Sequence, residues 1–377
     1  MFNFNKIWLA IFVVIISLPL VVQISGLNLD VESFENRAMA EYPKYPKNIK
    51  ELNKWTDRFE AYINDNLPFR IFMMKNYNTF LYYLEASANK KIILGENGWV
   101  FSNFDNVLNQ YIGRSFLSKA KTKNFCDVIK RNADYFESRK IPFYFFIAPN
   151  KHTIYNEHLP SYTNKIIKQK RNFDIVRSYL KENTQVREVN IRPDLLEYKQ
   201  KLPKLYYKTD THWNGFGSFV AYLRVINAIK MHFKSLKKLS WIDTYTKEEV
   251  KNKTDLSNIM GLWNNLEGVE INNRLKKNNR IKLERIGAKQ KFPAKETHII
   301  ETKNKSGLVL LLLRDSFSTA MIPYYEHSFS KIIATHHNYG DWDTSLLLRE
   351  KPDLVIFEVV ERYLGKQFKQ TKFPKNK

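Results

Sequence analysis

The spacing of hydrophobic residues along the 377-residue chain changes from helical to strand-like as the sequence proceeds. Between about residues 48 and 86, apolar side chains recur three and four positions apart, which predicts two helices separated at Leu67-Pro68. Beyond residue 140, short apolar runs alternate with longer amphipathic stretches. This alternation predicts an α/β fold, in which a mostly parallel sheet is covered by helices on both faces.

The apolar runs and the amphipathic stretches give the order of the predicted elements. Runs too short for a helix and rich in aliphatic or aromatic residues are typical of buried strands. The predicted strands cover residues 141–148, 186–189, 308–313, 331–335 and 354–359, and the main predicted helices cover about 119–139, 173–182 and 215–233.

A polar stretch interrupts this alternation. Residues 234–305 are rich in Lys, Arg and Asn and have no long apolar run, so we predict an insertion there. The predicted organisation is an apolar N-terminal segment, an extended segment with a helical arm, an α/β domain and a basic tail. These parts cover residues 1–26, 27–90, 91–364 (including the insertion) and 365–377.

The N-terminal segment has the character of a membrane anchor. Residues 7–22 are without a charged side chain, Lys6 precedes them, and acidic residues such as Asp30 and Glu32 follow. This pattern predicts an uncleaved signal anchor, with the amino terminus inside and the body outside the cytoplasm. A cleaved signal peptide is the competing interpretation, although residues 23–26 fit a cleavage site poorly. With either, we expect export, and the anchor places the chain in the cell inner membrane with its body in the periplasm.

The net charge of +23 permits two interpretations. One is affinity for an anionic partner, and the other, which we favour because the lysines are spread along the chain, is a general compositional bias. Nucleic-acid binding is not expected, since no recognition motif occurs and the amino terminus directs export. A single cysteine, Cys126, excludes an intrachain disulfide.

Two short motifs supply the residue types of a Ser-His-Asp triad. Ser316 follows the strand predicted at 308–313 and is the candidate nucleophile, while His212 is the candidate base and Asp210 its orienting carboxylate. The alternatives are a helix N-cap at Ser316 and a structural or metal-binding role for His212. No second cluster at metal-ligand spacing occurs, so we expect neither a metal nor a cofactor.

These motifs resemble those of the AlgX/AlgJ-like group of SGNH-hydrolase-type proteins, which are exported or membrane-anchored enzymes of polysaccharide O-acetylation. The resemblance implies an SGNH-hydrolase-like three-layer sandwich, with Asp210, His212 and Ser316 as the triad. The motif order is permuted, because in most SGNH hydrolases the serine comes first. The segments that carry the resemblance are residues 34–37, 148–151 with 159–160, 210–214, 314–317 and 361–363.

Several further residues are candidates for substrate contact. Asn150 and Asn338 are candidates for the oxyanion hole by position alone, since each follows a predicted strand. Lys151, Trp213 and Tyr339 are candidates for contact with a sugar. Arg314 stands where SGNH hydrolases usually have glycine, and it either crowds the turn or brings a cation near the substrate.

The leading functional prediction is an O-acetyltransferase that acts on an extracytoplasmic polysaccharide through an acetyl-serine intermediate. The resemblance implies a membrane-bound O-acyltransferase as the partner that delivers acetyl groups. A carbohydrate acetylesterase with the same triad, and a catalytically inactive glycan-binding or assembly protein, are the alternatives.

Overall fold

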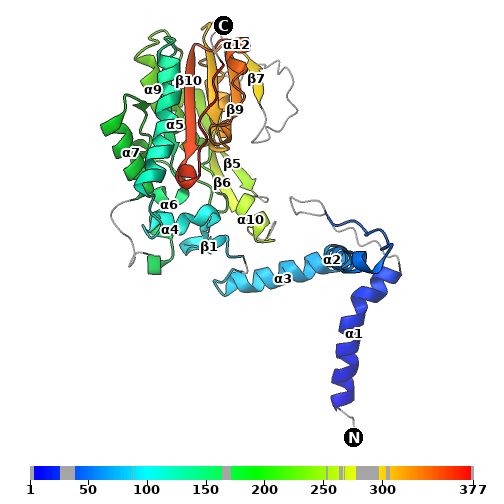
Figure 1. Cartoon of the computed structure of the whole chain (residues 1–377). Helices are drawn as coiled ribbons and strands as arrows, with labels where there is room; N and C mark the ends of the chain where they lie inside the picture. The colour runs from blue at the N-terminus through cyan, green and yellow to red at the C-terminus, as the bar shows by residue number, and fades with distance from the viewer. Residues whose placement is uncertain are drawn as a thin grey trace. The chain divides into compact units, whose positions relative to one another are not determined.

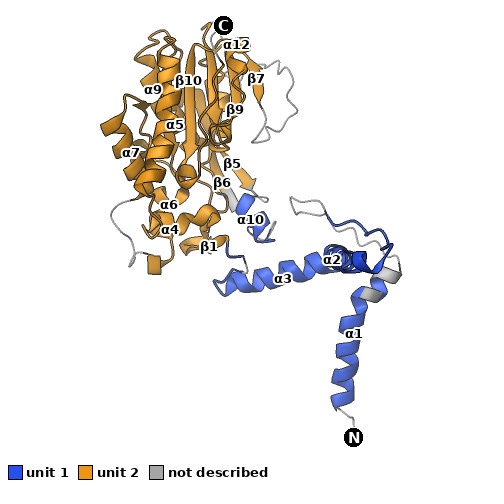
Figure 2. Ribbon diagram, in the orientation of Figure 1, with its two compact units in different colours: residues 1–90, 252–266 blue, residues 91–251, 267–377 orange. Residues whose placement is uncertain are grey.

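The structure is a computed structural model that describes residues 4–25, 39–87, 89–163, 171–251, 254–262, 266, 268–276, 297–302 and 306–374. The chain divides into two compact units, shown in different colours in Figure 2. Unit 1 comprises residues 1–90 and 252–266, and unit 2 comprises residues 91–251 and 267–377. Of the segments that carry the resemblance, residues 34–37 lie outside the described residues.

Unit 1 is helical. The two predicted helices are present as α2 (Ile49–Asn66) and α3 (Arg70–Tyr83). The side chain of Asn48 caps α2 by accepting from the backbone N–H of Glu51 at 3.1 Å. The remaining helices of the unit are α1 (Phe4–Ile24) and α10 (Asp255–Ile259).

Helix α1 coincides with the apolar N-terminal segment. Among the described residues, no helix combines the length and the apolar character needed to cross a membrane. The anchor predicted for residues 1–26 stays a prediction.

Unit 2 is built on a central sheet (Figure 1). Its six strands have the order β4-β3-β10-β8-β9-β7. The five strands from β4 to β9 are parallel, and β7 pairs antiparallel with β9 at the edge. The α/β prediction is confirmed, and the sheet is mixed because of β7. The strands are β3 (Phe143–Ala148), β4 (Arg187–Glu188), β7 (His298–Glu301), β8 (Val309–Arg314), β9 (Lys331–His336) and β10 (Leu354–Val360).

Helices cover both faces of this sheet. Because successive side chains of a strand point to opposite faces, Tyr144 and Phe146 of β3 pack in the cluster that contains the apolar face of α9. Phe143 and Phe145 pack in the other cluster, with α5, α7 and α12. The layer helices are α5 (Lys119–Glu137), α7 (Asn172–Asn183), α9 (Gly215–Lys230) and α12 (Leu346–Glu350).

Shorter elements surround the sheet. Strands β5 and β6 form an antiparallel hairpin in the range predicted as an insertion, and β7, from the same range, belongs to the main sheet. The end of the chain packs on the α5 side, where Phe368 is buried. The short elements are β1 (Ile92–Leu94), β2 (Val100–Ser102), α4 (Val107–Tyr111), α6 (Lys151–Ile154), α8 (Arg192–Lys199), β5 (Thr244–Lys251), β6 (Gly268–Leu275) and α11 (Ile322–Tyr325).

Candidate active site

Ser316 lies two residues beyond the carboxyl end of β8, in a turn that is held by its neighbour Asp315. One carboxylate oxygen of Asp315 accepts from the backbone N–H of Phe317 at 2.9 Å, and the other accepts from that of Val360 at 2.7 Å. The chain then forms a short 3-10 turn, Phe317–Ala320. The turn therefore fixes the backbone on both sides of Ser316, whose own side chain stays half-buried.

Arg314 lies beneath this turn. Its guanidinium is buried, and its Nη1 donates to the carbonyl of Asp315 and to Oγ1 of Thr319, both at 3.1 Å. Glu358, also buried, accepts from the backbone N–H of Asp315 at 2.9 Å. Burial raises the pKa of Glu358 well above its usual value and lowers that of Arg314. Arg314 thus supports the turn from the core.

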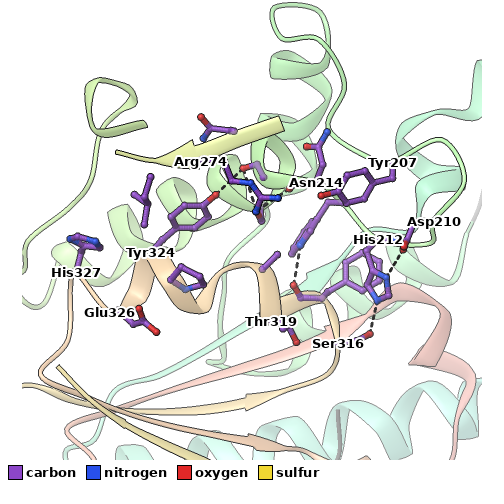
Figure 3. A pocket seen from close by; sticks show the side chains of 18 residues that line it. Tyr207, Asp210, His212, Asn214, Arg274, Ser316, Thr319, Tyr324, Glu326 and His327 are labelled. Atoms are coloured by element: carbon purple, nitrogen blue, oxygen red, sulfur yellow. Dashed lines mark hydrogen bonds and ion pairs between the residues drawn. The ribbon is translucent and has the colours of Figure 1, made fainter. Parts of the chain in front are cut away.

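His212 lies between Ser316 and Asp210 in the loop before α9 (Figure 3). Its Nε2 is 2.8 Å from Oγ of Ser316, and its Nδ1 is 2.7 Å from Oδ1 of Asp210. The same carboxylate oxygen accepts from the backbone N–H of His212 at 3.0 Å. This geometry suits a neutral imidazole that carries its proton on Nδ1 and accepts the serine proton at Nε2.

Lys151 holds the loop that carries Asp210. Its ammonium is buried, and Nζ donates to the carbonyls of Tyr207, Lys208 and Asp210 at 3.1, 2.9 and 2.6 Å. A buried ammonium with three acceptors is well satisfied, because Lys has three N–H donors. The lysine that the sequence suggested for sugar contact is thus committed to the backbone of this loop.

Trp213 connects the two motifs. The indole is buried and its Nε1 donates to the carbonyl of Phe317 at 3.0 Å. Its ring meets that of Phe317 edge to face, with centroids 5.1 Å apart. Trp213, which follows the candidate base His212, therefore forms a hydrogen bond with Phe317, which follows the candidate nucleophile Ser316.

A cavity of about 710 Å³ opens at the triad (Figure 3). Its volume lies within the range of about 300–1,000 Å³ that is common for small-molecule sites. Aromatic side chains and a few polar groups form its wall. Its lining includes Tyr207, Asp210, His212, Trp213, Arg274, Ser316, Phe317, Thr319, Tyr324, Glu326 and His327.

The other predicted site residues lie outside the lining of this cavity. The backbone N–H of Asn150 donates to Glu361 at 2.8 Å. The backbone N–H of Asn338 donates to Nδ1 of His336 at 2.9 Å, and the same Nδ1 lies 2.9 Å from Oδ1 of Asn338. The ring of Tyr339 packs against that of Tyr363, with centroids 5.4 Å apart. The structure therefore brings the triad and Trp213 to the cavity, but not Asn150, Lys151, Asn338 or Tyr339.

Metal-ligating groups of unit 2 come together in the triad pair of Asp210 and His212. Both residues also have the partners of a hydrogen-bonded triad, since His212 contacts Asp210 through Nδ1 and Ser316 through Nε2.

Sequence reasoning missed the wall of the cavity opposite the triad. Arg274 of β6 and Tyr324, Glu326 and His327 of the α11 region line it. No motif marks these residues, because Arg274 lies in a polar stretch and the α11 region follows the 3-10 turn without a recognisable pattern.

Comparison with protein families gives one match. The model of the SGNH hydrolase-like domain of the acetyltransferase AlgX matches residues 92–300, which is more than half of the chain. No curated protein matches the sequence significantly.

Solved structures share the fold at low sequence identity. PatB1 of Bacillus cereus matches with a TM-score of 0.56 and 17% identity, over 76% of this chain and 100% of PatB1. PatB1 with a sulfonyl adduct matches with a TM-score of 0.54 and 18% identity, over 74% of this chain and 100% of that one. A DHHW family protein of Eubacterium siraeum matches with a TM-score of 0.50 and 14% identity, over 67% and 90% of the two chains.

Proposed function

The chain belongs to the family of SGNH hydrolase-like domains typified by the acetyltransferase AlgX, and on this premise we propose that it transfers acetyl groups to hydroxyls of an extracytoplasmic polysaccharide. The observation that carries the proposal is the continuous line of hydrogen bonds from Asp210 through His212 to Ser316, with distances of 2.7 and 2.8 Å, at the opening of a cavity.

In the first half of the proposed reaction, Ser316 becomes acetylated. Nε2 of His212 takes the hydroxyl proton as Oγ attacks the acetyl carbonyl of the donor. Asp210 accepts from Nδ1–H and stabilises the imidazolium that forms. The imidazolium then gives its proton to the leaving group of the donor, which departs and leaves acetyl-Ser316.

In the second half, the acetyl group moves to the sugar. Nε2 of His212 takes the proton of a sugar hydroxyl, whose oxygen attacks acetyl-Ser316. The ester bond to Oγ breaks, and the serine recovers its proton from His212. Because water competes with the sugar for the acetyl-enzyme, transfer requires a bound acceptor in the cavity. An esterase would result if water were the preferred acceptor.

The location and the donor partner are parts of the same proposal. The apolar residues 7–22, with Lys6 before them and acidic residues after them, support a single-pass anchor at the cell inner membrane and a body in the periplasm. Membership in the family supports delivery of acetyl groups by a membrane-bound O-acyltransferase. A chain anchored beside such a partner would receive acetyl groups where they emerge.

The test uses the purified full-length chain with a small chromogenic acetyl ester and a mixture of oligosaccharides. We expect wild type to release the chromophore and to add acetyl groups to an oligosaccharide, as read by mass spectrometry. Ser316→Ala and His212→Ala should abolish both. Release of acetate without any acetylated oligosaccharide would support the esterase, and wild-type release equal to that of the two folded variants would refute acyl transfer at this site.

A further inference from the structure

Strand β6 of the β5–β6 hairpin lines the cavity with Asn273, Arg274 and Leu275, and the side chain that matters most here is Arg274. Nε of Arg274 donates to Oε1 of Glu249 at 2.9 Å, and Nη2 donates to Oε2 of the same carboxylate. This bidentate pairing fixes the guanidinium plane and leaves its remaining N–H groups for other acceptors. Arg274 lines the cavity with its side chain 39% exposed (Figure 3).

The hairpin is fixed to the same segment that carries the proposed base. Oδ1 of Asn272 accepts from the backbone N–H of Gly215, the first residue of α9, at 2.6 Å. A Cβ at Gly215 would lie 2.1 Å from the carbonyl oxygen of Asn273, so β6 packs against the start of α9 without room for a side chain at this position. Nδ2 of Asn272 donates to Glu249 and to the hydroxyl of Tyr207 at 3.1 and 2.8 Å. Asn272, two residues before Arg274, therefore connects β6 to the start of α9, three residues after His212.

The charges around the cavity differ from those of the whole chain. Although the chain carries a net charge of +23, Arg274 is the one Lys or Arg among the described residues that line the cavity, and Glu249 neutralises it. Asp210 and Glu326 add carboxyl groups to the lining, and Figure 3 shows them on opposite sides of Arg274. His327 adds no positive charge at neutral pH, because burial lowers its pKa.

We propose that this cavity is the acceptor site and that it selects an uncharged sugar, with Arg274 donating hydrogen bonds to the sugar hydroxyls. The inference rests on the proposed function, since it names the substrate class of that reaction. A uronic acid would bring a carboxylate between Asp210 and Glu326, and the described residues that line the cavity hold no Lys or Arg besides Arg274, which is already paired with Glu249. A neutral sugar needs only donors and acceptors, which Arg274 and its neighbours supply at fixed positions.

The first experiment compares acceptors of equal length that differ only in charge. Oligomers of glucose, mannose and galactose, and their uronic-acid counterparts, are given to the full-length chain with the small acetyl ester. We expect the best neutral oligomer to exceed every uronic-acid oligomer by about tenfold or more in kcat/KM for transfer, which corresponds to one unfavourable charge contact. Glu326→Gln should narrow this difference.

The second experiment tests Arg274. Arg274→Ala should reduce transfer to the best neutral acceptor by about 10- to 100-fold more than it reduces chromophore release from the small ester, as expected for a lost charge-assisted hydrogen bond. Arg274→Lys keeps the positive charge but lacks the planar guanidinium with its paired N–H donors. Its rate of transfer should lie between those of wild type and Arg274→Ala. Arg224→Ala, on an exposed part of α9, is the matched control, and thermal unfolding of each variant checks that the hairpin is intact.

The outcomes separate this inference from the proposed function. Equal or better transfer to uronic acids, transfer to none of the oligomers, or equal losses of release and transfer in Arg274→Ala would each overturn the acceptor assignment while acetyl-Ser316 still forms. If Ser316-dependent release itself is missing in wild type, the proposed function fails, and this inference fails with it.

Discussion

The indole Nε1 of Trp213 donates to the backbone carbonyl of Phe317 at 3.0 Å. Trp213 directly follows the proposed base and Phe317 directly follows the proposed nucleophile, although the two motifs lie 104 positions apart in the sequence. One buried hydrogen bond therefore joins the loop before α9 to the turn after β8. The distance between His212 and Ser316 therefore depends on the hydrogen bond between Trp213 and Phe317 as well as on their own contact.

Trp213→Phe tests the hydrogen bond between Trp213 and Phe317. The substitution removes the indole donor to the carbonyl of Phe317 and leaves part of a buried site unfilled, so we expect the free energy of unfolding to fall by about 1–3 kcal/mol. Chromophore release should fall by about tenfold or more, because small displacements of catalytic groups are costly. Urea unfolding and steady-state kinetics measure the two effects. The control is Trp241→Phe, which makes the same change at a ring that packs on Phe219. Equal losses of stability and of chromophore release in the two variants would contradict a special role for the hydrogen bond of Trp213.

Lys151→Met separates a positioning role from contact with the sugar. Methionine keeps the length of the side chain but leaves the carbonyls of Tyr207, Lys208 and Asp210 without their common donor. We expect a loss of about 2–4 kcal/mol in stability and a lower kcat, because the Asp210 loop loosens. Lys199→Met, which removes a donor to the carbonyl of Ile154, is the control. A higher KM with unchanged stability would instead indicate that Lys151 binds the sugar.

Stability should fall between neutral pH and pH 5 because two histidines are buried in their neutral form. Burial lowers the pKa of His337 and of His152 to about 3, whereas an unfolded chain titrates near about 6.5. Between these values the unfolded state binds more protons, so the stability present above about pH 6.5 is lost as the pH falls. At pH 5 the loss is about 2 kcal/mol for each histidine.

Urea unfolding at pH 7.5 and pH 5 measures this loss. His337→Asn is the matched variant, since the side-chain oxygen of asparagine replaces Nδ1 as the acceptor for the backbone N–H of Tyr339. The variant should lose about 2 kcal/mol less than wild type over this pH interval. An equal loss in both proteins would show that His337 does not contribute.

Gly215→Ala tests the contact between the hairpin and α9. A Cβ at this position would lie 2.1 Å from a backbone oxygen, so β6 has to move away. We expect a loss of at least about 1–3 kcal/mol, as in other overpacked sites, and weaker acceptor transfer. Gly365→Ala, where the nearest atom is a side-chain carbon at 3.7 Å, should remain close to wild type. Similar melting temperatures of the two variants would contradict the close contact.

The sheet was predictable because buried parallel strands are continuous apolar runs. β3, β8, β9 and β10 have this pattern, and their helices are amphipathic. The hairpin of β5 and β6 was not predictable, since β5 is largely polar and its register with β6 depends on pairs such as Thr244 and Leu275. The antiparallel β7 was missed for a related reason: four residues at the end of a Lys-rich stretch give too short a pattern.

The candidate site was predictable where a single motif contains both residues of a contact. Asp210 lies two residues before His212, and this spacing alone permits the observed contact. Asn150 and Asn338 each follow a strand, and this position places a residue at the edge of a sheet without setting the direction of its side chain. Arg274 was missed because its partner Glu249 is 25 positions away and on another strand.

The position of the acetyl group on the enzyme is the most direct evidence for or against acyl transfer through Ser316. The full-length chain is incubated briefly with the chromogenic acetyl ester, quenched in acid and digested for tandem mass spectrometry. We predict one acetyl group on Oγ of Ser316 in wild type, and none at that position in His212→Ala. An unmodified Ser316 in folded wild type that still releases the chromophore, or an acetyl group accumulating on another residue, would contradict this prediction.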